Sequence, residues 1–287
     1  AVALCRNDQT APDLVRYPDH AERLGLSAKD HWSRGAVFLW LLDLMQQNPS
    51  KRIIACFDAA FSLPFEGGSS GGYFPHHETV TPKSISNARS LWQLVDRHCG
   101  GGDLSFSAKD DFYAGPLVEM FKDYFLRPKY RGQYFSPRFR AGESYDAAQV
   151  KLGRMESPFH LIGPSQVGMA GLSVMRLLHR LSGHAEVAIW PYDPIDTARL
   201  VIVETFATAY IRMAGIRGKI RDIDGINQML SYWDSEPIKS LPTDDQITDH
   251  DSDAIAMSVG LRSIARQKAY WQPAGLSEQG RKTEGWI

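Results

Sequence analysis

The chain has 287 residues, of which 43% are hydrophobic and 23% charged, a composition typical of folded globular proteins. Its net charge of −1 excludes a strong overall field toward nucleic acid or membranes, although a local basic patch stays compatible with it. The sequence contains no apolar run of bilayer length, no signal peptide, and no metal or disulfide spacing among its three cysteines. We therefore expect one cytoplasmic domain over residues 1–287 without a membrane partner, and find no signal for an oligomeric state.

The first predicted elements are a hairpin, a helix and a strand. "AVALC" is typical of a strand whose beginning lies upstream of Ala1, and "DLVRYP" is its expected partner. Residues 28–47 have apolar side chains spaced for one helix face. Residues 53–57, "IIACF", predict a buried strand that is followed directly by Asp58, and a further helix is expected over 86–97.

The second half alternates helices with strands. Residues 168–181 predict a helix, and "EVAIWPY" and "ARLVIVETF" predict strands, the second apolar enough for the centre of a sheet. We expect helices in "ATAYIRMAG", ended by Gly215, in "DIDGINQMLSYWDS" and in "TDHDSDAIAMSVGLRSIARQKAY", and a closing strand in "EGWI". The alternation predicts an α/β fold.

The region of about 66–150 interrupts this pattern as an irregular insertion rich in glycine, aromatic and basic residues. Lys129, Arg131, Arg138 and Arg140 alternate there with aromatic side chains, a pattern that can hold phosphates while bases stack on the rings. These four cations are therefore candidates for substrate binding. The alternative is a lid whose rings pack on the domain while its arginines face water.

Acidic residues occur where an α/β sheet brings strand ends and helix starts to one edge. Asp58 follows one apolar strand, Glu204 ends another, and the last long helix opens with Asp249, Asp251 and Asp253. Carboxylates brought together need a cation, and oxygen ligands select Mg²⁺ or Mn²⁺. Two such ions held by shared carboxylates are suited to in-line cleavage of phosphodiester bonds.

Each acidic residue also has an explanation that involves no metal. Asp58 could cap a turn, and acids at a helix start complement the helix dipole. Glu204 lies inside "VIVETF", where a buried charge needs a partner, and Lys219 or an arginine could neutralise it.

Five stretches occur in an order that resembles a bacterial family of predicted RNase H-like nucleases: "FDAAFSLP", "HLIGPSQVG", "VIVETFATAY", "HDSDAIAMSVGLRSIA" and "EGWI". The resemblance is dispersed over most of the chain, but it does not cover about 66–145. It implies an RNase H-like mixed sheet flanked by helices, with a central insertion, and a nuclease that depends on Mg²⁺ or Mn²⁺.

The resemblance matches Asp58, Glu204 and Asp253 to family carboxylates that would hold the metal, with Asp249 or Asp251 assisting. It also matches Lys219 to a lysine that would steady a phosphate or the developing charge. The RNase H-like fold has a further aspartate on its first strand, which we expect upstream of this chain.

These observations lead us to expect a metal-dependent phosphodiester hydrolase, a nuclease, that acts on nucleic acid or a nucleotide. The alternative is a non-catalytic nucleotide- or protein-binding module on the same fold, which the near-neutral charge and the missing first-strand aspartate favour. A phosphotransferase of the related ATPase fold would need glycine-rich phosphate hairpins, for which "EGGSSGG" and "CGGGD" are poor candidates.

Overall fold

The computed structural model describes residues 1–68, 71–81, 83–99, 116–145, 156–163, 167–239 and 247–287. It divides into two compact units. The helical unit comprises Ala1–Trp32 and Thr205–Pro273, and the sheet unit comprises Ser33–Glu204 and Ala274–Ile287. The single domain expected over residues 1–287 stays a prediction.

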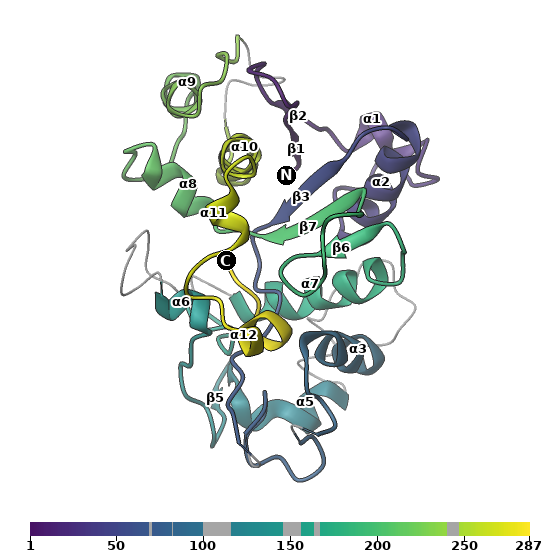
Figure 1. Cartoon of the computed structure of the whole chain (residues 1–287), viewed down its shortest axis with the longest axis vertical. Coiled ribbons are helices and arrows are strands. Elements are labelled where there is room, and N and C mark those ends of the chain that lie inside the picture. Colours follow the sequence, from purple (N-terminus) through teal and green to yellow (C-terminus); the bar gives the residue numbers. More distant parts are fainter. Residues whose placement is uncertain (69–70, 82, 100–115, 146–155, 164–166, 240–246) are drawn as a thin grey trace. The chain divides into compact units, whose positions relative to one another are not determined.

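A three-stranded parallel sheet forms the centre of the sheet unit, which confirms the α/β class. Its strands are β3 (Ile53–Phe57), β6 (Val187–Ile189) and β7 (Leu200–Glu204), in the order β3-β7-β6 (Figure 1). Strand β7 is buried along its whole length, as expected for the central strand. Strand β3 was expected to be buried but is only half-buried, because it lies at an edge of this sheet and has a neighbouring strand on one side.

Three long helices accompany the sheet: α2 (Arg34–Gln47), α3 (Ala88–His98) and α7 (Val167–Leu181), and α7 packs against both others. Helix α2 begins six residues later than the predicted 28–47, since Ser33 caps it by accepting a hydrogen bond from the Ala36 N–H at 3.1 Å. Between α3 and α7, Asp96 pairs with Arg180 at 3.1 Å.

The predicted insertion contains short elements within its described part. They are α5 (Pro116–Phe121), the 3₁₀ helix η1 (Lys122–Tyr124), the hairpin β4 (Leu126–Arg127) and β5 (Tyr130–Arg131), and α6 (Ala141–Tyr145). Residues 69–70, 82, 100–115 and 146–150 of the predicted insertion lie outside the described part. The strand predicted for "EGWI" is wrong. Helix α12 (Glu278–Thr283) ends just before it, and residues 284–287 are neither helix nor strand.

The helical unit begins with the predicted hairpin, in which β1 (Ala3–Leu4) pairs antiparallel with β2 (Asp13–Leu14). Its helices are α1 (Pro18–Ala21), α8 (Ala207–Met213), α9 (Ile223–Tyr232), α10 (Asp249–Ile264) and α11 (Lys268–Trp271). Gly215 has a φ of +79° and follows the end of α8, as the sequence indicated. The long helix predicted to run to Tyr270 instead ends at Ile264, and the short α11 follows it.

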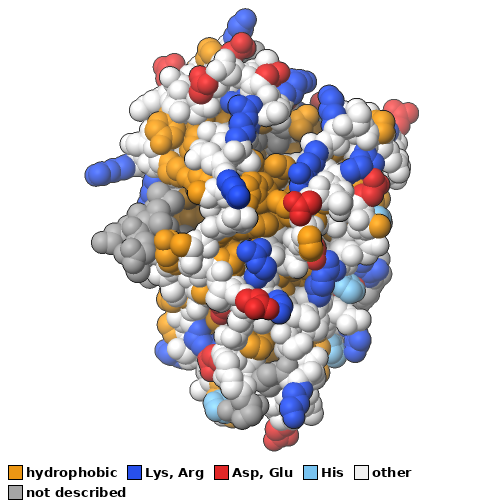
Figure 2. Space-filling view, in the orientation of Figure 1, with side chains coloured by type: hydrophobic (Ala, Val, Ile, Leu, Met, Phe, Trp, Pro, Cys, Tyr) orange, Lys and Arg blue, Asp and Glu red, His pale blue; other side chains and the backbone are white. Residues whose placement is uncertain are grey.

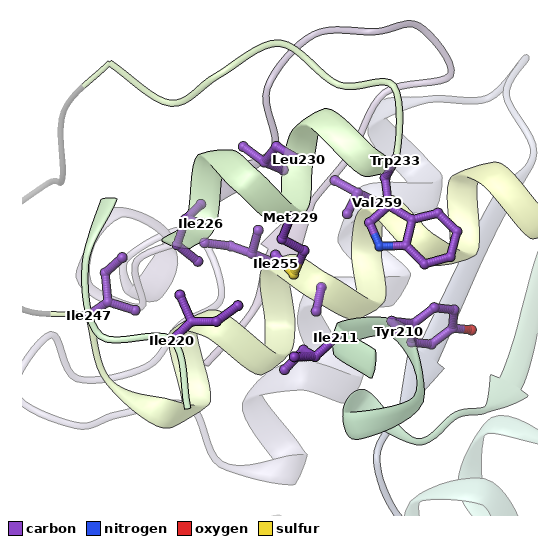
Figure 3. Close-up of a cluster of buried hydrophobic side chains, with 11 residues drawn as sticks. Tyr210, Ile211, Ile220, Ile226, Met229, Leu230, Trp233, Ile247, Ile255 and Val259 are labelled. Atoms are coloured by element: carbon purple, nitrogen blue, oxygen red, sulfur yellow. The ribbon is translucent and has the colours of Figure 1, made fainter. Parts of the chain in front are cut away.

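The core of the helical unit lies between α8, α9 and α10 (Figure 3). Its buried members are Tyr210, Ile211, Ile220, Ile226, Met229, Leu230, Trp233, Ile247, Ile255, Ala256 and Val259. Gly260 allows α10 to approach α8 closely, because a Cβ at this position would lie 2.1 Å from the Tyr210 ring. The apolar spacing seen in the sequence of these helices therefore corresponds to one packed cluster.

Charged side chains of both signs are scattered over the face drawn in Figure 2. This distribution agrees with the near-neutral net charge. In the part of the chain that the structure describes, no helix combines the length and apolar character needed to cross a membrane.

Candidate functional site

The sheet places two of the predicted carboxylate residues at its carboxyl edge. Strands β3 and β7 run parallel with Phe57 opposite Glu204, so Asp58 follows one position beyond the paired residues. Asp58 lies in an exposed bend, whereas Glu204 is 4% exposed. Ligands of open α/β sheets bind at this kind of edge.

Glu204 is engaged by an arginine. Its Oε1 binds Arg140 Nη2, and its Oε2 accepts hydrogen bonds from Arg140 Nη1 at 2.7 Å and from the Phe61 N–H at 2.8 Å. An arginine partner was one of the alternatives left open by the sequence, and it is the arrangement found. A buried charge requires such a partner, since its desolvation is costly.

Burial raises the pKa of the Glu204 carboxyl, and Arg140 opposes that shift. Burial by itself would lower the pKa of Arg140, but the carboxylates of Glu143 and Glu204 outweigh it and raise that pKa. The guanidinium consequently stays charged, and its positive charge holds two carboxylates in a site removed from solvent.

Two acidic residues that the sequence analysis did not single out complete this network. Glu143 Oε1 accepts a hydrogen bond from Arg140 Nε at 2.8 Å, and its Oε2 accepts one from the Arg140 N–H at 2.7 Å. Glu284 accepts hydrogen bonds from the N–H groups of Phe65 at 2.6 Å and Ala141 at 2.9 Å. The i, i+3 spacing of Arg140 and Glu143 was a usable signal. No local pattern marks Glu284.

The predicted acidic cluster lies at the start of α10, in the helical unit. Thr248 caps the helix by accepting a hydrogen bond from the Asp251 N–H at 3.1 Å. Asp251 Oδ2 in turn accepts hydrogen bonds from the Thr248 hydroxyl at 2.7 Å and the Thr248 N–H at 3.3 Å. This capping box gives Asp251 a structural role of the kind that the helix-start alternative anticipated.

The other two acids of α10 have different surroundings. Asp249 pairs with Lys219 and, at 2.9 Å, with Arg221 Nη1. The predicted phosphate-binding Lys219 is thus next to one predicted metal ligand. Asp253 is half-buried, and burial raises its pKa while His250 and Lys219 oppose the shift. A bound cation would offset that desolvation, so the oxygen donor of Asp253 suits Mg²⁺ or Mn²⁺.

The four predicted substrate-binding cations have two kinds of environment. Lys129 and Arg131 are exposed in the β4–β5 hairpin. Arg138 is half-buried, pairs with Glu66 at 2.5 Å and lies over the Phe159 ring at 4.5 Å from its centroid. Arg140 is only 2% exposed. Lys129 and Arg131 are therefore open to solvent, whereas Arg140 is almost completely buried.

Among the residues with described positions, no group of three or more His, Cys, Asp or Glu side chains is arranged to hold a metal ion. Comparison of the chain with protein-family models, curated proteins and solved structures finds no match.

Proposed function

We propose that the protein is a metal-dependent phosphodiester hydrolase, a nuclease, built on an RNase H-like fold. The observation that carries the proposal is the register of two parallel strands. Phe57 lies opposite Glu204, so the carboxylates of Asp58 and Glu204 belong to neighbouring strand ends at the carboxyl edge of the sheet. Metal-dependent phosphodiester chemistry uses oxygen ligands of this type.

Asp58 of the sheet unit is a proposed ligand for Mg²⁺ or Mn²⁺. In the helical unit, Asp253 is a proposed ligand, with Asp249 or Asp251 assisting. Glu204 stays a predicted metal ligand, but a metal ion would have to compete with Arg140, because the guanidinium binds both carboxylate oxygens of Glu204. When bound, the ions would polarise the phosphodiester group. Lys219, a cation that is paired with Asp249, would stabilise negative charge as it develops on the phosphate.

Calorimetric titration with Mn²⁺ tests the proposal. We expect Asp58→Asn and Asp253→Asn each to weaken binding by at least about tenfold, since each removes a charged ligand. Asp19→Asn is the matched control, because Asp19 is an exposed aspartate in the first turn of α1.

Loss of binding in the aspartate variants, together with Mn²⁺-dependent cleavage of labelled DNA or RNA by the parent chain, would support the hydrolase. The absence of any heat of Mn²⁺ binding to the parent chain, or identical Mn²⁺ affinity in the parent chain and all variants, would refute the metal mechanism. The control must bind as the parent chain does for the comparison to hold.

A non-catalytic nucleotide- or protein-binding module is the second candidate. The observation that favours it is the commitment of both Glu204 oxygens to Arg140 and the Phe61 N–H. This alternative predicts oligonucleotide or nucleotide binding that is unchanged by Mn²⁺ and by Asp58→Asn, with no cleavage product over long incubation.

A further inference from the structure

Positive charge is concentrated in residues 122–140. This stretch contains six basic residues and one acidic residue, whereas the whole chain contains 32 and 33. The acidic residue, Asp123, accepts hydrogen bonds from the Tyr130 hydroxyl at 2.5 Å and from Gln133 Nε2 at 3.1 Å. Its carboxylate is therefore occupied in holding the hairpin together, and the exposed charges of Lys129 and Arg131 dominate the hairpin tip.

Exposed aromatic rings accompany these cations. Tyr130, Tyr134 and Phe139 are 39%, 45% and 43% exposed. With Tyr145, they make up four of the six large hydrophobic side chains that are exposed in the described part of the protein. Arg127 places its guanidinium 5.5 Å from the centroid of the Tyr130 ring. Part of each of these rings is therefore open to solvent, while Tyr134 also contacts the buried Tyr124 ring, with 5.4 Å between the two centroids.

The backbone beneath these side chains is held by hydrogen bonds. Strand β4 pairs with β5, and the Leu126 N–H donates a hydrogen bond of 3.0 Å to the Phe159 carbonyl. The Tyr134 N–H donates a hydrogen bond of 2.8 Å to the Asp123 carbonyl. Gly132 permits this closeness, because a Cβ there would lie 2.2 Å from the Asp123 carbonyl oxygen. A surface held in this way loses little conformational entropy when a ligand binds.

We propose that residues 126–139, the hairpin surface, bind a single strand of nucleic acid. Tyr130 and Tyr134 would stack on unpaired bases, and Lys129 and Arg131 would contact phosphates. Alternating rings and cations suit single strands, because base stacking on aromatic side chains requires bases that are free of a duplex. The inference rests on the proposed function and specifies its substrate class.

A lipid surface fits the hairpin surface less well. The Tyr130 hydroxyl donates to the Asp123 carboxylate, which keeps a negative charge at the edge of that ring. Anionic lipid would meet this charge as the ring entered the interface, whereas a base can stack on the face of the ring without approaching the carboxylate. Tyr130 is neutral at physiological pH because the ordinary tyrosine pKa is about 10, and its hydrogen bond to Asp123 raises that pKa further.

Fluorescence anisotropy with a labelled single-stranded oligonucleotide of about 15 nucleotides, in EDTA, measures binding without cleavage. We expect Tyr130→Ala and Tyr134→Ala each to weaken binding about tenfold. Substituting both Lys129 and Arg131 with alanine should make the slope of log K against log salt less negative by about 1.4, the contribution of two phosphate contacts. Tyr130→Phe keeps the ring and should retain most of the affinity.

Matched controls remove the same groups elsewhere. Lys51→Ala with Lys282→Ala removes two exposed charges, and Tyr270→Ala removes an aromatic ring that is 43% exposed. Both controls should bind as the parent chain does. Equal losses in the controls and the hairpin variants, tighter binding to duplex than to single strands, or preferred binding to anionic vesicles would each overturn the inference.

The experiment separates this inference from the hydrolase proposal. Binding in EDTA requires no metal, so it is measured independently of Mn²⁺-dependent cleavage. Binding that depends on the hairpin surface without Mn²⁺-dependent cleavage would leave the inference standing and remove the hydrolase. Mn²⁺-dependent cleavage by the parent chain, together with unimpaired oligonucleotide binding by the hairpin variants, would support the hydrolase and overturn the inference about the hairpin surface.

Discussion

Arg140 and Glu204 form a buried ion pair in which one guanidinium binds both carboxylate oxygens, with Nη1 2.7 Å from Oε2. Their side chains are only 3% and 2% exposed. The pair ties the segment before α6 to the end of the central strand β7. It also sets a condition for metal binding by Glu204, because a metal ion would compete with the guanidinium for the same oxygens.

Removing Arg140 should destabilise the protein strongly. Arg140→Ala would leave the buried carboxylates of Glu143 and Glu204 without their cation, a change that costs about 3–5 kcal/mol of unfolding free energy. Urea denaturation followed by circular dichroism measures this loss. Arg131→Ala is the control, because Arg131 is exposed and its loss should change stability by less than about 0.5 kcal/mol. Similar losses for both variants would contradict the assigned role of the pair.

The half-buried Asp253 should give stability a defined pH dependence. Burial raises its pKa in the folded state above the ordinary value of 3.8, so its contribution to stability is full below that value and is lost as pH rises through the folded pKa. Asp253→Asn removes the cost of the buried charge. We therefore expect it to be more stable than the parent chain at pH 7 without metal.

The difference between Asp253→Asn and the parent chain should shrink as pH falls through the raised folded pKa toward 3.8, because the folded aspartate takes up its proton in that interval. Thermal melts between pH 4 and pH 8 would measure it. A variant that is less stable than the parent chain at pH 7 would show that Asp253 is held by favourable contacts of its charged form.

The capping box at α10 predicts a moderate loss. Thr248→Ala removes the hydroxyl that accepts the Asp251 N–H and donates to Asp251 Oδ2. The expected cost is about 1 kcal/mol of unfolding free energy, measured in urea. Thr248→Ser retains the hydroxyl and should restore most of the stability. An unaltered midpoint in Thr248→Ala would mean that the cap contributes nothing.

The close approach of α10 and α8 predicts intolerance of a side chain at Gly260. A methyl group there would lie 2.1 Å from the Tyr210 ring, so Gly260→Ala should cost about 1–3 kcal/mol of unfolding free energy. Tyr210→Leu, which removes the clashing ring, should make the same substitution less harmful. Additive losses in the double variant would show that the two residues are not coupled in this way.

Most of the elements followed from local patterns in the sequence. The apolar run of β7 predicted a central buried strand, and the apolar spacing in α7 predicted a helix, because burial against the core imposes a period on each element. The acidic start of α10 was also visible. Helix ends were less accurate, since the Ser33 cap rather than apolar spacing determined where α2 begins.

The partners of the site residues were decided only by tertiary structure. The sequence predicted that the buried Glu204 carboxylate needs a cation, but its partner Arg140 lies 64 positions away. The Glu284 carboxylate likewise accepts a hydrogen bond from the Phe65 N–H, 219 positions away. The "EGWI" strand is absent for a local reason: the N–H groups of Glu284 and Gly285 donate hydrogen bonds to the Gly280 carbonyl at the end of α12, and Gly285 has a φ of +76°. Sequence patterns record that a charge is buried or exposed; the path of the whole chain selects which group neutralises it.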